Sequence, residues 1–83
     1  DEQEQQRLDE KLNRLRSCAK ERPMVCITHF VPDERKQGGA YVTEQVCVRR
    51  VDAYAHAVCI TGGGSIAFGD IIGIEGDIFQ EKY

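Results

Sequence analysis

Two histidines, His29 and His56, are the side chains best suited to acid–base catalysis in this chain, because imidazole titrates near neutral pH. His29 lies in a segment typical of a strand, His56 lies near an expected hairpin turn, and neither belongs to a recognisable catalytic motif. The serines, Ser17 and Ser65, have no nucleophile-elbow context. The sequence therefore predicts that the protein is not an enzyme and has no catalytic residues.

Cysteine with histidine is the usual ligand set for structural zinc, so the four cysteines are the candidate metal ligands. They are Cys18, Cys26, Cys47 and Cys59. No two of them form a C-x-x-C pair, and Cys26 and His29, three residues apart on an expected strand, would point to opposite faces. We therefore expect no metal site and no cofactor, and we interpret the cysteines as small buried hydrophobes or incidental thiols.

A glycine run, Gly62–Gly64, resembles the loops that hold phosphate groups through backbone N–H groups. Such loops work at the start of a helix. The residues that follow, from Ser65 to Phe68, are typical of a strand. The glycines therefore predict a hairpin turn.

A charged loop between two strand-like segments is the strongest candidate for a binding surface, because rigid elements commonly present functional loops. Its charged residues are Asp33, Glu34, Arg35 and Lys36. Phe30 and Tyr41 flank the loop and are candidate anchors, since aromatic residues and arginine dominate interface energetics. For Phe30, packing in the core is the alternative.

The net charge of −3, from 14 acidic and 11 basic side chains, gives no overall electrostatic attraction for nucleic acid. A nucleic-acid or anion contact would need a local patch. The candidates are Arg35 and Lys36 in the loop, and Arg49 and Arg50 farther along. The competing interpretation is ordinary solvated charge.

The first 22 residues predict one amphipathic helix, because apolar residues recur at spacings of four, three and four. These residues are Leu8, Leu12, Leu15 and Ala19. Pro23 ends the helix. The narrow stripe favours packing on its own domain, and a partner-binding or coiled-coil helix is the alternative.

After Pro23 the pattern changes to that of β-strands, which are rich in β-branched and aromatic residues. Strands are expected at residues 24–31, 40–51, 55–60, 66–68 and 71–74, the last continuing toward Phe79. This predicts an α+β, mainly β fold: a helix (1–22) followed by a small five-stranded SH3- or Sm-like barrel (23–83), together one domain.

The hairpin formed by the second and third strands has an expected register. Pairing Val46 with Ile60 and Val48 with Val58 gathers four branched apolar residues on one side. The same register places Cys47 opposite Cys59, close enough for a strained disulfide under oxidation.

No apolar run reaches the eighteen or so residues of a membrane span, and the acidic N-terminus is unlike a signal peptide. We therefore expect a cytoplasmic protein without a membrane association.

Three stretches in order resemble the YolD-like family of small bacterial proteins. They are Ile27-Thr-His-Phe-Val-Pro-Asp-Glu-Arg-Lys-Gln-Gly-Gly-Ala-Tyr-Val-Thr43, Val48-Arg-Arg-Val-Asp-Ala-Tyr54 and Ile66-Ala-Phe-Gly-Asp-Ile-Ile-Gly-Ile-Glu-Gly-Asp-Ile-Phe79. The resemblance covers roughly the last two-thirds of the chain. It implies a compact Sm-like or SH3-like barrel, often encoded on prophages and mobile elements and sometimes beside Y-family translesion polymerases, with no established catalytic residues.

Two functional hypotheses follow. The first is an adaptor or regulator that binds a protein partner through the charged loop and the adjoining strand edge, in DNA-damage tolerance with a Y-family polymerase. The second is a phage or mobile-element inhibitor of a bacterial defence system, acting by protein blockade or by sequestering a nucleotide signal with Arg49, Arg50 or Lys36. Exposed strand edges also predict a homodimer.

Overall fold

The computed structural model describes residues 2–79, apart from the side chains of Glu2 and Glu4. Asp1, the expected first residue of the helix, and residues 80–83 of the expected barrel lie outside this part of the chain.

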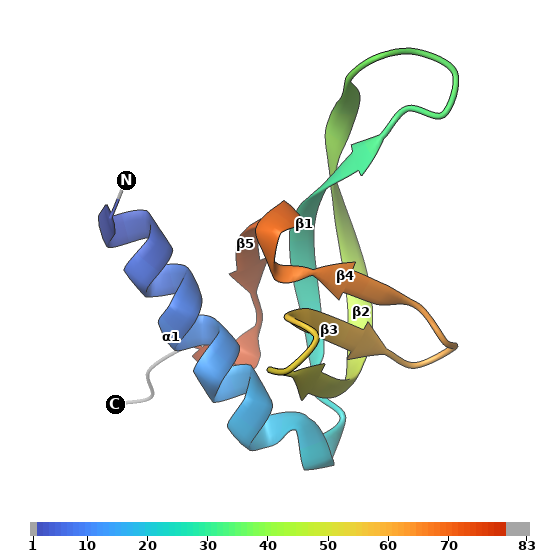
Figure 1. Ribbon diagram of the computed structural model, residues 1–83. Coiled ribbons are helices and arrows are strands. Elements are labelled where there is room, and N and C mark those ends of the chain that lie inside the picture. The colour runs from blue at the N-terminus through green and yellow to red at the C-terminus, as the bar shows by residue number, and fades with distance from the viewer. Residues whose placement is uncertain (1, 80–83) are drawn as a thin grey trace.

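One helix precedes five strands, and the fold is α+β with most of its regular structure in the sheet (Figure 1). Helix α1 runs from Glu2 to Cys18, and a 3₁₀ turn, η1, follows at Ala19–Glu21. The strands are β1 (Met24–Pro32), β2 (Gly39–Asp52), β3 (Ala57–Ile60), β4 (Ser65–Ala67) and β5 (Ile71–Glu75). Short 3₁₀ turns occupy Phe68–Asp70 (η2) and Asp77–Phe79 (η3).

The strands form one antiparallel sheet in the order β4-β3-β2-β1-β5. Strand β2 is the longest, because one part of it pairs with β1 and its C-terminal part pairs with β3. The expected helix and five strands are confirmed. Closure of the sheet into a barrel of the SH3 or Sm type stays a prediction.

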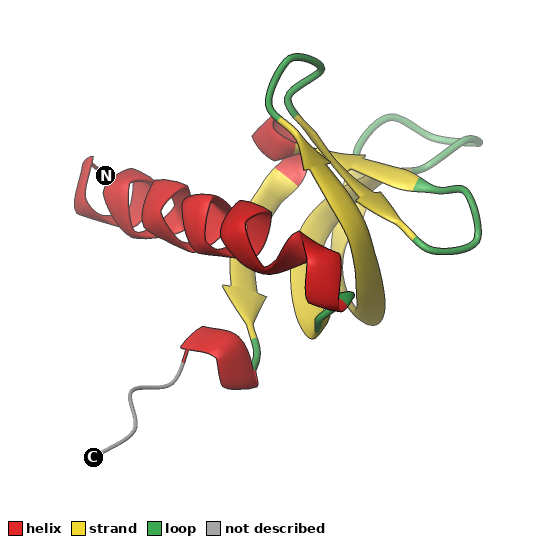
Figure 2. Cartoon of the chain, turned by 90° about the horizontal axis from the view of Figure 1, so that it is seen from below, coloured by secondary structure: helices red, strands yellow, loops and turns green. Residues whose placement is uncertain are grey.

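Helix α1 lies across the open side of the curved sheet, where it contacts β2, β5 and η3 (Figures 1 and 2). Leu12 and Leu15 enter the hydrophobic core, and Leu8 packs at its margin. The strands supply the rest of the core: Val25, Ile27, Val46, Val48, Val58, Ile66, Ile71 and Ile74. The narrow leucine stripe is thus used to cover the chain's own sheet, which is the packing expected for it.

The chain turns sharply between the helix and β1. Arg22 adopts a left-handed conformation, with φ of 55°, and its N–H donates to the carbonyl of Ala19 at 3.0 Å. Pro23 follows, and a proline cannot supply the backbone donor that a longer helix would need. The α-helix therefore ends at Cys18, four residues before the predicted end, and η1 continues the helical segment to Glu21.

The expected register between β2 and β3 is wrong. Val48 pairs with Ile60, and after an irregularity at Arg49 the pairs become Arg50–Cys59 and Val51–Val58. A bulge of this kind inserts a residue that alternation of apolar positions does not reveal. The turn is also longer than expected, since β3 begins at Ala57 rather than residue 55.

The altered register separates the two cysteines that were expected to face each other. The Cys47 thiol donates to the carbonyl of Arg22 at 3.2 Å, whereas Cys59 lies opposite Arg50. Both cysteines are free thiols. At Val48, before the bulge, the observed register differs from the expected one by two residues. A two-residue shift leaves each side chain on the same face of the sheet, so Val46 and Val48 are still buried.

The end of the chain also differs from the expectation. Strand β5 stops at Glu75, and the residues after Gly76 form η3 instead of extending the strand. Ile78 and Phe79 then pack against the core from this turn. Likewise β4 ends at Ala67, and Phe68 begins η2.

Candidate functional site

The β1–β2 hairpin projects from the body of the protein (Figure 1). Strand β5 pairs with β1 only as far as His29, and the pairing of β3 with β2 begins at Val48. Beyond the last pairing with β5, residues 30–41 form a two-stranded ribbon and its loop, which we call the arm. Isolated two-stranded ribbons are marginally stable, so the arm depends on its own contacts.

Asp33 organises the loop at the tip of the arm. Its N–H donates to the carbonyl of Gly38 at 3.0 Å, and its carboxylate accepts the N–H of Arg35 at 2.8 Å. Such local side-chain bonds to backbone stabilise turns. Asp33 therefore has a structural role in the loop.

Glu34, Arg35 and Lys36, the other three charged residues of the loop, are exposed. Within residues 2–79, none of them forms an ion pair. Their charged groups are therefore available to a partner without the cost of breaking an existing pair.

Tyr41 and Phe30 lie directly opposite each other on β2 and β1, at the base of the loop. Tyr41 is 59% exposed, and its ring meets the edge of the Phe30 ring with centroids 5.5 Å apart. The Phe30 ring also covers Gly39, where an added Cβ would collide with Phe30 Cζ and with the carbonyl oxygen of Val31. Phe30 is therefore partly a packing residue, and Tyr41 is the aromatic that solvent reaches.

His29 lies at the foot of the arm with its side chain turned toward the core. It is 9% exposed, and its Nε2 lies 2.5 Å from the carboxylate of Glu44 on the neighbouring strand. This contact satisfies a polar group that would otherwise be buried without a partner. His56 is exposed in the β2–β3 turn, with φ of 55°.

Arg49 and Arg50 lie at the far end of β2 from the loop. The path along the strand from Gly39 to Arg49 is roughly 34 Å, at about 3.4 Å for each residue. The structure thus does not bring the four candidate basic residues into one patch. Arg50 lies 3.5 Å from Asp52. The pKa of Arg50 is raised, mainly by Cys59, which lies opposite it on β3, with a further contribution from Asp52.

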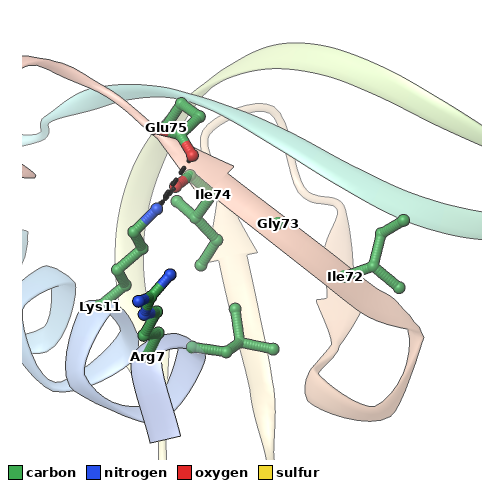
Figure 3. A pocket seen from close by; sticks show the side chains of 7 residues that line it. Arg7, Lys11, Ile72, Gly73, Ile74 and Glu75 are labelled. Carbon is green, nitrogen blue, oxygen red and sulfur yellow. Dashed lines mark hydrogen bonds and ion pairs between the residues drawn. The ribbon is translucent and has the colours of Figure 1, made fainter. Parts of the chain in front are cut away.

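A groove between α1 and β5 was not predicted from the sequence (Figure 3). Its volume is about 470 Å³. It is lined by Arg7, Leu8, Lys11, Ile72, Gly73, Ile74 and Glu75. A second hollow of about 240 Å³ shares Arg7 and Lys11 and reaches Arg14 and Phe79.

Lys11 is already engaged by β5. Its ammonium donates to the carbonyl of Ile74 at 2.7 Å and to the carboxylate of Glu75 at 2.9 Å, as the dashed lines in Figure 3 show. It also lies 5.6 Å from the centre of the Phe79 ring. Arg14 likewise donates to the carbonyl of Ile78 at 2.8 Å. The groove is therefore a helix-to-sheet contact with one further cation, Arg7, at its mouth.

A sequence signal for this groove exists. Arg7, Lys11 and Arg14 recur at spacings of four and three, beside the leucine stripe, and so share a helix face. Their partners on β5 and η3 are more than sixty residues away, as in the Lys11–Ile74 and Arg14–Ile78 contacts. Nothing in the local pattern identifies such distant carbonyl groups.

Two general findings bear on the candidate sites. Within residues 2–79, no group of three or more His, Cys, Asp or Glu side chains is arranged to hold a metal ion. No helix in the same residues is long and apolar enough to cross a membrane.

Comparison of the chain with protein-family models, with curated proteins and with solved structures finds no match.

Proposed function

We propose that this protein is a non-enzymatic adaptor that binds a protein partner through the tip of the arm. The observation that carries the proposal is the position of the charged loop, which is held clear of the body beside an exposed tyrosine. Aromatic residues and arginine supply much of the energy in protein interfaces, with charged residues at the rim. Tyr41 would be the anchor, and Asp33, Glu34, Arg35 and Lys36 would be the rim.

The partner class rests on the resemblance to YolD-like proteins. That family's association with Y-family polymerases supports a cytoplasmic adaptor in DNA-damage tolerance. The division of β2 between β1 and β3 supports, in addition, the SH3- or Sm-like barrel that the resemblance implies.

The experiment compares three forms of the tagged protein in pull-downs from its own cells, followed by titration against the purified captured polymerase. The forms are wild type, Arg35→Ala/Lys36→Ala at the loop, and Arg49→Ala/Arg50→Ala at the far end of β2. We expect the loop variant to bind at least about tenfold more weakly, the equivalent of about 1.4 kcal/mol. The far-end variant, which removes the same charge, should bind normally.

Two results contradict the proposal. One is unchanged affinity of the Arg35→Ala/Lys36→Ala variant with an intact circular dichroism spectrum. The other is equal weakening by both double variants, since that would indicate general electrostatic attraction rather than contact at the loop.

The second candidate function is that of a phage or mobile-element inhibitor of a bacterial defence system. Blockade of a defence protein could use the same arm. Sequestration of a nucleotide signal needs a hollow with basic donors, and the α1–β5 groove with Arg7 is the feature that favours it. Arg49 and Arg50 are not among the residues that line either hollow. Mass spectrometry of small molecules released by denaturing the purified protein tests for sequestration, because neither blockade nor adaptor function requires a bound nucleotide.

A further inference from the structure

One side of β2 carries backbone N–H and C=O groups that have no hydrogen-bond partner on a neighbouring strand. The carbonyl of Cys47 accepts the N–H of Thr61, at the start of the turn after β3, at 3.0 Å. Alternate residues of a strand direct their N–H and C=O groups to the same side. Gln45, Thr43 and Tyr41 therefore direct theirs to the side of β2 on which β3 lies, but β3 begins to pair only at Val48.

The side chains agree with this assignment. The hydroxyl groups of Thr28 and Thr43 are 2.7 Å apart, and side chains approach most closely at antiparallel pairs that do not exchange backbone hydrogen bonds. The backbone groups of Thr43 then point away from β1. Along residues 41–45, β2 thus has an open edge in the described part of the chain.

The other edges of the sheet offer fewer groups to a new strand. Lys11 occupies the outward carbonyl of Ile74 on β5. Strand β4 has only three residues, and short edge strands offer little for a new strand to pair with. The unpaired end of β1 finishes at Pro32, which has no N–H. Residues 41–45 contain no proline and one charged residue, Glu44.

We propose that this edge of β2 pairs with the same edge of a second copy, forming an antiparallel dimer with its two-fold axis at Thr43. In this register Thr43 faces Thr43 of the other copy and Tyr41 faces Gln45. The N–H and carbonyl groups of Tyr41, Thr43 and Gln45 in each copy then all find partners. The pairing goes beyond adaptor function and leaves the charged loop free.

Neighbouring registers leave the outward groups of Thr43 or of Gln45 without full pairing. An axis at Gln45 would oppose Thr43 to Cys47, whose carbonyl already accepts from Thr61. An axis at Tyr41 would pair Thr43 with Gly39, the first residue of β2, but would place Gln45 opposite the loop, where it has no strand partner. The axis at Thr43 also sets Glu44 against Val42, so no like charges face each other.

The interface is small, since it adds backbone bonds over five residues. Interfaces that bury less than about 1,200 Å² belong to weak, transient complexes. We therefore expect dissociation on the order of micromolar or weaker. Sedimentation equilibrium from low micromolar to near-millimolar concentration covers this range.

The test uses opposite charges on the axis. Thr43→Lys and Thr43→Glu each place two like charges face to face, so each variant alone should remain at the single-chain mass of 9.4 kDa. An equimolar mixture brings Lys opposite Glu and should restore the dimer. Thr28→Lys is the matched control, because it has the same charge on the same face and also breaks the Thr28–Thr43 contact, but lies one strand away from the axis.

We expect wild type and Thr28→Lys to reach twice the single-chain mass at high concentration. In the same samples, exchange of the Tyr41, Thr43 and Gln45 amide hydrogens should slow as concentration rises. A wild-type protein that stays monomeric throughout overturns the proposal. So does a dimer that persists in both Thr43→Lys and Thr43→Glu, or a mixture of the two that stays monomeric.

Discussion

The ring of Tyr41 stands at 69° to the ring of Phe30, in an edge-to-face contact with 5.5 Å between their centroids. The two residues are direct partners across β1 and β2. This contact is one of those that hold the strands together beyond the last pairing with β5. It thus couples the stability of the arm to a residue proposed for partner binding.

Tyr41→Ala should lower the free energy of unfolding by about 1 kcal/mol, because an aromatic pair contributes about 0.5–1.5 kcal/mol beyond area burial. Tyr41→Phe keeps the ring and should unfold like wild type. Urea denaturation followed by circular dichroism measures both. Equal stability of Tyr41→Ala and wild type would show that the ring contact does not hold the arm.

Glu44→Ala should destabilise the protein because it leaves the buried imidazole of His29 without its hydrogen-bond partner. The expected loss is about 1–2 kcal/mol, the usual range when one partner of a buried hydrogen bond is removed. Glu44→Gln retains a hydrogen-bonding group and should lose less. Chemical denaturation at fixed pH should give free energies of unfolding that decrease from wild type to Glu44→Gln to Glu44→Ala. A Glu44→Gln protein less stable than Glu44→Ala would contradict this explanation.

Lys11→Met should lower stability by about 1–2 kcal/mol, since it removes a charge-assisted bond to the carbonyl of Ile74 and the pair with Glu75. Arg7→Met is the matched control, because it removes a cation from the same groove without breaking a bond to the described residues. Thermal unfolding compares the two variants, and hydrogen exchange in β5 should quicken only in Lys11→Met. Equal melting temperatures of Lys11→Met and Arg7→Met would show that the bonds of Lys11 to β5 do not stabilise the fold.

Asp52 should make stability depend on pH in the acid range. The pKa of its carboxyl is lowered, chiefly because it accepts the N–H of Ala55 at 2.9 Å, with smaller contributions from Arg50 and from the N–H of Tyr54. A carboxyl whose pKa is lower in the folded state stabilises the fold above its unfolded-state pKa. That stabilisation is lost as pH falls from the ordinary value, near 3.8, through the folded-state pKa.

The comparison that tests this dependence is wild type against Asp52→Ala across the acid range. The variant should be less stable than wild type at neutral pH, and the difference should shrink as pH falls below about 4. A difference that stays constant down to the most acid pH would mean that the charge of Asp52 does not stabilise the turn.

The helix and the strands were predictable because each has a clear sequence pattern of apolar or β-branched residues. The leucine spacing of the helix and the β-branched runs of the strands locate one helix and five strands within a few residues of their observed bounds. The register of β2 and β3 was not predictable, because apolar alternation determines which face a side chain takes but is unchanged by a two-residue shift. The bulge at Arg49 and the left-handed His56 in the turn set the register.

The candidate site was predictable in part for the same reason. A charged loop between two strands is a local feature, and the structure places it at the tip of the arm with Tyr41 exposed beside it. Arg49 and Arg50 were grouped with the loop by charge alone, and the length of β2 separates them from it. The α1–β5 groove depends on contacts between residues far apart in the sequence, which local patterns do not contain.

The bond from Lys11 to the carbonyl of Ile74 bears on whether the proposed self-association stops at two copies or continues. A sheet that is open on one side joins a single other copy, and the pair has no free side left. A sheet that is open on both sides adds copies head to tail without limit, which is the geometry of a growing fibre. By engaging one outward carbonyl of β5, the helix opposes the addition of a strand at that edge and favours an assembly that ends at the proposed dimer.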